Sequence, residues 1–167
     1  MKWLGLIVIV TAAVILQMSF LPGLRPFGVV PNLVLVVIVL ASLHIVTSQA
    51  LMAAAASGLI LDLVGGTNFG LWTGVLMLVV LVVGLMRRAG IELDVLVVAT
   101  ILVAAATIVI AVVIWMTFIP LVANWPVGVA AGRLMIELVI NLSLMLLLRL
   151  PIRWLLGSSR QSAVMGA

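Results

Sequence analysis

Long apolar stretches separated by short polar breaks follow one another along almost the whole chain. A helix needs roughly 20 apolar residues to cross a bilayer, and several stretches approach that length. The pattern predicts spans over residues 3–21, 32–46, 49–64, 69–86, 95–119 and 127–150. The expected fold class is therefore all-α. We expect one polytopic membrane domain over residues 1–156, a bundle of about six transmembrane helices, and a short flexible cytoplasmic tail over residues 157–167.

Proline and glycine mark the breaks between these spans. Pro22, Pro26 and Pro120 follow apolar runs, where a missing amide proton interrupts a helix. A cleavable signal peptide is the alternative for the first span, because Lys2 precedes an apolar run. The run exceeds the usual ~7–15 residues and no Ala-x-Ala-like site follows, so we expect a retained helix.

Composition supports a membrane protein and excludes several kinds of chemistry. Hydrophobic residues make up 67% of the chain and charged residues 7%, whereas soluble domains are about 45–50% apolar and about 25% charged. The absence of cysteine excludes disulfides, Cys-ligated zinc and thiol catalysis. A single histidine, His44, excludes a multi-histidine metal site. The cations are scattered, which does not suggest nucleic acid, and we expect no cofactor.

The distribution of basic residues predicts the orientation. With both termini cytoplasmic, the inner side holds Lys2, Arg87, Arg88, Arg149, Arg153 and Arg160. Arg25 then lies outside and Arg133 lies near or within the membrane. This fits the positive-inside rule. Tryptophan prefers the membrane–water interfaces, and all five tryptophans fall at predicted helix ends.

Three ionisable groups are expected inside the membrane, where they usually face the bundle interior: Asp62, Arg133 and Glu137. Ala54 and Gly58 lie four residues apart, a small-xxx-small pattern that lets helix backbones approach closely. Asp62 lies one turn further along the same face. A close-packed face therefore leads to a carboxylate near the outer end of its helix.

Arg133, Glu137 and Asn141 form a second polar stripe at intervals of four residues. One interpretation is structural, with an Arg133–Glu137 ion pair and an interhelical hydrogen bond from Asn141. A pair between Asp62 and Arg133 across the bundle is a specific alternative. Two further interpretations of the stripe are that it contacts a partner or ligand, or that it moves ions or protons.

The residues provide no catalytic set. Intramembrane aspartyl proteolysis needs two aspartates in one site, and Asp62 and Asp94 are expected on opposite sides of the membrane. Serine catalysis would need His44 to meet Ser57, which lacks a Gly-x-Ser context. We interpret His44 as an interface residue and expect a protein that is not an enzyme.

Two segments together resemble the MreD family of rod-shape-determining membrane proteins. The first contains Pro31-Asn32 before the second predicted span. The second is similar to the family's Gly-x-x-x-Asp-x-x-x-Gly-x-x-x-Gly stretch, with Gly58, Asp62, Gly66 and Gly70. Asn141, followed by leucines and a basic end, is also similar to the family.

The resemblance implies a non-enzymatic, multi-pass protein of the bacterial inner membrane that regulates cell shape. Such proteins bind MreC and act with MreB, the glycosyltransferase RodA and its partner transpeptidase in lateral peptidoglycan synthesis. Gly66 and Gly70 would form the turn between the third and fourth spans, and Asp62 would cap that turn or contact a partner. The alternative is the substrate-binding membrane component of an energy-coupling-factor vitamin transporter, which has a similar size and architecture.

Overall fold

A computed structural model describes residues 2–24, 28–65, 69–90, 94–118 and 127–157. Within these ranges every regular element is a helix. The elements are α1 (Lys2–Ser19), α2 (Leu21–Leu24), α3 (Leu33–Ser42), α4 (Thr47–Gly65), α5 (Leu71–Arg88), α6 (Val95–Phe118) and α7 (Val127–Gly157). The predicted all-α fold class is confirmed. Gly66, Trp125 and the tail over 158–167 lie outside the described residues.

Five helical segments are long and apolar enough to cross a membrane: Trp3–Gly23, Thr47–Gly65, Leu71–Arg88, Val95–Met116 and Gly128–Leu156. Many of their large apolar side chains point away from the protein, for example Leu63, which is 66% exposed, and Leu147, which is 72% exposed. A surface of this kind suits hydrocarbon rather than water. The chain is a multi-pass membrane protein, and these five segments agree with the predicted spans to within a few residues, except that α7 continues past Pro151 to Gly157.

The second predicted span, over residues 32–46, is the exception. Its helix, α3, covers only 10 residues, which is about 15 Å at the usual rise and half of a ~30 Å hydrocarbon core. The prediction of a full-length span here is wrong. Residues 29–32 lead into the helix without helical structure, and the turn after it is held by Arg87, whose Nη1 donates to the carbonyl of Ile45 at 2.6 Å.

Enclosure by the rest of the bundle explains how so short a helix is stable. All ten residues of α3 are buried, and the helix contacts α1, α4, α5, α6 and α7. Its sequence has no polar face, which is the pattern of a helix that is surrounded on all sides. Non-helical backbone at membrane depth is tolerated where protein covers it, so the segment before α3 depends on its neighbours.

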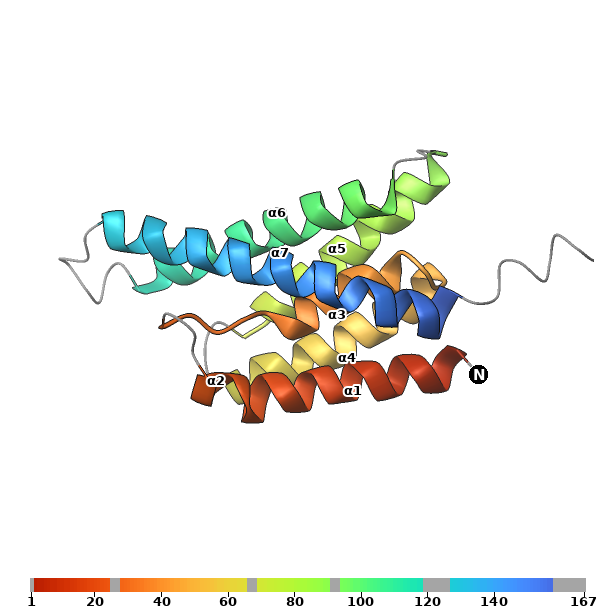
Figure 1. Cartoon of the computed structure of the whole chain (residues 1–167), viewed down its shortest axis with the longest axis horizontal. Coiled ribbons are helices and arrows are strands. Elements are labelled where there is room, and N and C mark those ends of the chain that lie inside the picture. Colours follow the sequence, from red (N-terminus) through yellow and green to blue (C-terminus); the bar gives the residue numbers. More distant parts are fainter. Residues whose placement is uncertain (1, 25–27, 66–68, 91–93, 119–126, 158–167) are drawn as a thin grey trace, which may run out of the picture.

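The helices run back and forth along one long axis, with α6 and α7 along one side, α1 along the opposite side and α3 between them (Figure 1). The N-terminal end of α1 and the C-terminal end of α7 lie at the same end of the bundle. We call this the terminal end. The other end, which holds α2 and the N-terminal ends of α5 and α7, is called the α2 end.

Candidate functional site

Asp62, near the C-terminal end of α4, fixes the start of α5. Its carboxylate is buried at 3% exposure and accepts hydrogen bonds from the backbone amides of Trp72 at 2.9 Å and Thr73 at 3.1 Å. The hydroxyl of Thr73 donates a third bond at 2.6 Å. The first amides of a helix lack partners within the helix and carry partial positive charge, so a carboxylate is well suited to them. Asp62 therefore caps α5 from the neighbouring helix.

Two glycines make this cap geometrically possible. A Cβ atom on Gly58 would lie 2.5 Å from the Cα and 2.7 Å from the amide nitrogen of Thr73, so α4 and α5 are in backbone contact there. Gly70 immediately precedes α5 with a φ of +92° and no side-chain cap of its own, a conformation that glycine adopts without strain. Gly58 and Asp62, one turn apart, thus both face Thr73. The close-packed face expected from the sequence is present.

A second buried cluster holds the N-terminal end of α3. Asn141 on α7 is fully buried. Its Oδ1 accepts from the backbone amide of Asn32 at 2.8 Å, and its Nδ2 donates to Thr107 Oγ1 on α6 at 3.1 Å. The side chain of Asn32 in turn donates to Glu137 Oε1 at 2.7 Å. The interhelical hydrogen bond expected from Asn141 is therefore present, and its partner is Thr107.

Gln17 on α1 completes this cluster. Its Oε1 accepts from the backbone amide of Val34 at 2.8 Å. Together with Asn141, it satisfies two amides at the start of α3, which would be costly to bury without partners. Sequence reasoning missed Gln17 and Thr107. The available signal was a polar residue near the middle or end of a predominantly apolar span, which several other positions share.

The contacts of Asp62 and Glu137 bear on the two ion pairs considered for Arg133. Asp62 accepts from α5 and Glu137 accepts from Asn32. Pairing of Arg133 with either carboxylate stays a prediction. Pro31, which precedes Asn32, is buried and contributes to the segment before α3.

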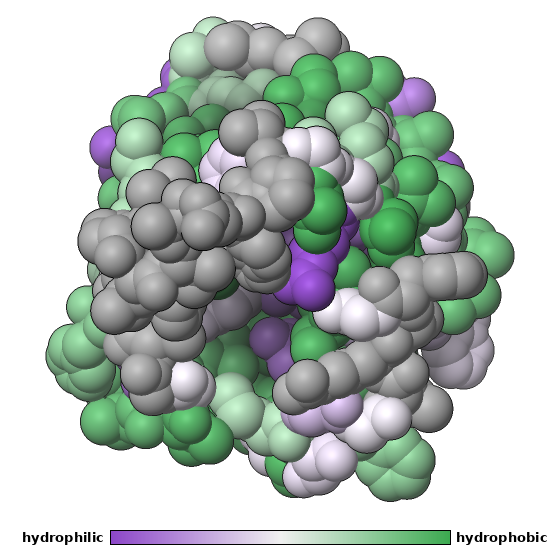
Figure 2. Space-filling model, turned by 90° about the vertical axis from the view of Figure 1, so that its left-hand side faces the viewer, coloured by the Kyte–Doolittle hydropathy of each residue, from purple (hydrophilic) through white to green (hydrophobic). Residues whose placement is uncertain are grey.

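A cavity of about 540 Å³ lies at the α2 end, where residues of α1, α4, α6 and α7 and of the segment before α3 line it. Its polar lining comes from Gln17, Asn32, Arg133 and Glu137, and its apolar lining includes Trp72 and Ile114. Figure 2 shows this end of the molecule hollowed, with hydrophilic residues inside and hydrophobic residues around them. Ligand pockets are typically about 300–1,000 Å³, mostly apolar and equipped with a few polar groups. The cavity has these properties.

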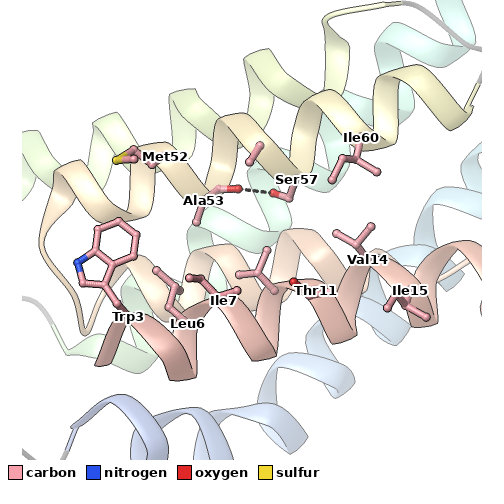
Figure 3. A pocket seen from close by; sticks show the side chains of 12 residues that line it. Trp3, Leu6, Ile7, Thr11, Val14, Ile15, Met52, Ala53, Ser57 and Ile60 are labelled. Atoms are coloured by element: carbon pink, nitrogen blue, oxygen red, sulfur yellow. Dashed lines mark hydrogen bonds between the residues drawn. The ribbon is translucent and has the colours of Figure 1, made fainter. Parts of the chain in front are cut away.

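A second cavity, a groove of about 430 Å³, lies between α1 and α4 and is almost entirely apolar. Trp3, Leu6 and Val14 line one wall, and Met52 and Ile60 line the other (Figure 3). The hydroxyl of Ser57 in this groove donates to the carbonyl of Ala53 in its own helix at 2.7 Å. The groove therefore offers an apolar surface with little hydrogen-bonding capacity.

The other candidate polar residues contact their own or adjacent elements. Nδ1 of His44 lies 2.8 Å from the carbonyl oxygen of Leu40, one turn earlier. Asp94 accepts from the amide of Leu96 at 2.9 Å and so caps α6. Among the residues that the structure describes, no three His, Cys, Asp or Glu side chains are grouped to hold a metal ion.

Comparison with protein-family models, with curated proteins and with solved structures finds no match to this chain.

Proposed function

We propose that this chain is a non-enzymatic membrane component of the bacterial elongation machinery, as its resemblance to the MreD family implies. It would reside in the inner membrane, bind MreC, and through it act with MreB, RodA and the partner transpeptidase in lateral peptidoglycan synthesis. Its contribution would be a rigid helical body against which partner helices and loops dock.

The main support for this proposal is that the residues that resemble the family's motifs hold helices of the bundle together. Gly58, Asp62 and Gly70 join α4 to α5 through a backbone contact and a buried cap. Asn32 and Asn141 join α3 to α7. Residues that hold helices together suit a protein that provides a rigid binding surface rather than one that catalyses a reaction.

The positions of the cations support the proposed orientation. Lys2, Arg88 and Arg153 lie in elements that begin or finish at the terminal end, whereas Arg133 lines the cavity at the α2 end. By the positive-inside rule the terminal end would face the cytoplasm. The cavity would then face the outer side of the membrane.

Solute binding is the second candidate, and the cavity at the α2 end is the observation that favours it. Its volume of about 540 Å³ and its polar wall would suit the substrate-binding component of an energy-coupling-factor vitamin transporter. Such a protein would bind its solute from the outer side, where the proposed orientation places the cavity.

Depletion of the protein in the bacterium that encodes it separates the two candidates. On the first, rods should widen and become round before growth stops, and the tagged protein should co-purify with MreC. On the second, cells should remain rods but require an added vitamin. Rod shape retained throughout depletion, with or without a vitamin requirement, would refute the proposal.

A point variant tests the link between the bundle and cell shape. Asp62→Asn weakens the cap on α5 and should reduce complementation of the depleted strain. Asp94→Asn makes the same chemical change at an exposed cap and should complement fully. Protein amounts in the membrane are measured in both strains, so that loss of the protein is distinguished from loss of its activity.

A further inference from the structure

Arg133 and Glu137 lie where two cavities meet. Both residues line the polar cavity at the α2 end. Both also line a groove of about 300 Å³ between α6 and α7, whose other residues are almost all apolar, including Val112, Ala130 and Leu134. Ile114 belongs to both linings as well. The polar cavity therefore adjoins an apolar groove on the side of the bundle, with these three residues at the boundary.

The groove lies on the surface that the spanning helices present to hydrocarbon. Val112, which lines the groove, is 41% exposed, and Val129, which precedes the lining residue Ala130, is 45% exposed. Ala111, Ala130 and Ala131 line it, and such small side chains leave room between α6 and α7. An occupant of the groove would be apolar, whereas an occupant of the adjoining cavity would be polar. One amphiphilic molecule satisfies both requirements.

The charges at the junction indicate which polar group such a molecule carries. Arg133 and Glu137 are four residues apart on α7 and so project from the same side of the helix. A guanidinium has five N–H donors in a fork that matches phosphate oxygens. Glu137 accepts one hydrogen bond from Asn32, and a carboxylate has about four acceptor sites, so it can also accept from an ammonium group. A positive and a negative group side by side complement a zwitterion.

We propose that this junction binds a phospholipid whose headgroup carries a phosphate and a primary ammonium. The phosphate would bind Arg133, the ammonium would donate to Glu137, and an acyl chain would lie in the groove between α6 and α7. The opposite charges favour this headgroup over a purely anionic one. The adjoining apolar groove favours a lipid over a water-soluble solute. This inference does not depend on the proposed role in cell shape.

The test is native mass spectrometry of the purified full-length protein in detergent with three lipids of identical acyl chains. Phosphatidylethanolamine should be retained in preference to phosphatidylcholine, whose quaternary ammonium cannot donate a hydrogen bond, and to phosphatidylglycerol, which has no cation. Arg133→Gln and Glu137→Gln should each reduce retention of phosphatidylethanolamine by about tenfold, the effect of losing one charged hydrogen bond. Glutamine at 137 can still accept from Asn32, which protects the fold.

Arg153→Gln is the matched control, because Arg153 lies on the same helix at the terminal end and its loss should leave the preference unchanged. Ala130→Leu places extra atoms in the groove and should lower retention of all two-chain lipids. Unfolding temperatures are compared to show that each variant is folded.

Several outcomes would overturn the inference. Equal retention of the three lipids, or preference unchanged in both charge variants, would exclude a headgroup site. Stronger retention of phosphatidylglycerol, increased further by Glu137→Gln, would indicate an anionic lipid. Competition by chain-free phosphoethanolamine at the same concentration as the lipid would indicate a solute site.

Discussion

Replacing Gly58 with alanine tests whether α4 and α5 are in backbone contact. The new Cβ would lie 2.5 Å from Thr73 Cα and 2.7 Å from its amide nitrogen, whereas carbon atoms in contact lie about 3.5–4.0 Å apart. Both neighbouring atoms belong to the backbone, so no side-chain rotation relieves the overlap. The helices must separate locally by about 1 Å.

This separation would also damage the cap one turn away. The bonds from Trp72 and Thr73 to Asp62 measure 2.9 and 3.1 Å, and a shift of about 1 Å takes them beyond hydrogen-bonding range. Overpacking costs about 1–3 kcal/mol and loss of a cap about 1–2 kcal/mol. Because the two effects share one displacement, we expect the free energy of unfolding to fall by about 2–4 kcal/mol.

The assay is reversible unfolding of the purified protein in mixed micelles, with Gly74→Ala as control. Gly74 lies on α5 directly after Thr73, and a Cβ there meets nothing within 4 Å. Alanine at this position should be neutral or stabilise the protein by up to about 1 kcal/mol. The free energy of unfolding of Gly84→Ala should lie between those of the other two variants, because its Cβ would meet mainly the movable methyl group of Thr47, at 2.7 Å. Equal stability of Gly58→Ala and Gly74→Ala would refute the backbone contact.

Three further sets of substitutions probe the caps and the second cluster by the same assay. Asp62→Asn should lower the free energy of unfolding by about 1–3 kcal/mol, because an amide nitrogen replaces one acceptor of buried donors. Asp94→Asn, at an exposed cap, should lower it by less than about 1 kcal/mol. Equal losses would contradict a special role for the buried cap. Asn141→Leu and Thr107→Val should each destabilise the bundle, with a coupling of about 0.5–3 kcal/mol in a double-mutant cycle, and strict additivity would argue against their hydrogen bond. Gly70→Ala should cost about 1–2 kcal/mol through its positive φ alone, and Gly70→Asn should recover part of this loss.

The sequence predicted the long helices well because their apolar runs are nearly as long as a bilayer is thick. It also placed Gly58 and Asp62 on one helix face, since that follows from helical periodicity. The resemblance implied that Asp62 caps the turn after its helix or contacts a partner, and the structure shows a cap on the first amides of α5, but the sequence did not identify those amides. Periodicity gives the direction of a side chain but not the neighbour on that side, and the amides of Trp72 and Thr73 have no signature in the sequence.

The short α3 and its anchoring residues show a second limit. The apolar run over residues 33–42 and its flanks has the same hydrophobic pattern whether lipid or protein surrounds the helix. The burial of α3 inside the bundle therefore could not be predicted. Gln17 and Asn32 are 124 and 109 residues from Asn141 along the chain, by their numbers. Only the packing of α1, α3 and α7 brings them into one cluster.

The dependence of α3 on distant side chains has a consequence for biosynthesis. Gln17 is synthesised before α3, so its bond to the amide of Val34 can form as soon as α3 leaves the ribosome. The amide of Asn32 must wait for Asn141, which is synthesised 109 residues later. The centre of the bundle is therefore completed only when α7 enters the membrane. Until then, nascent chains would expose an unfinished core to the insertion machinery and to quality-control proteases.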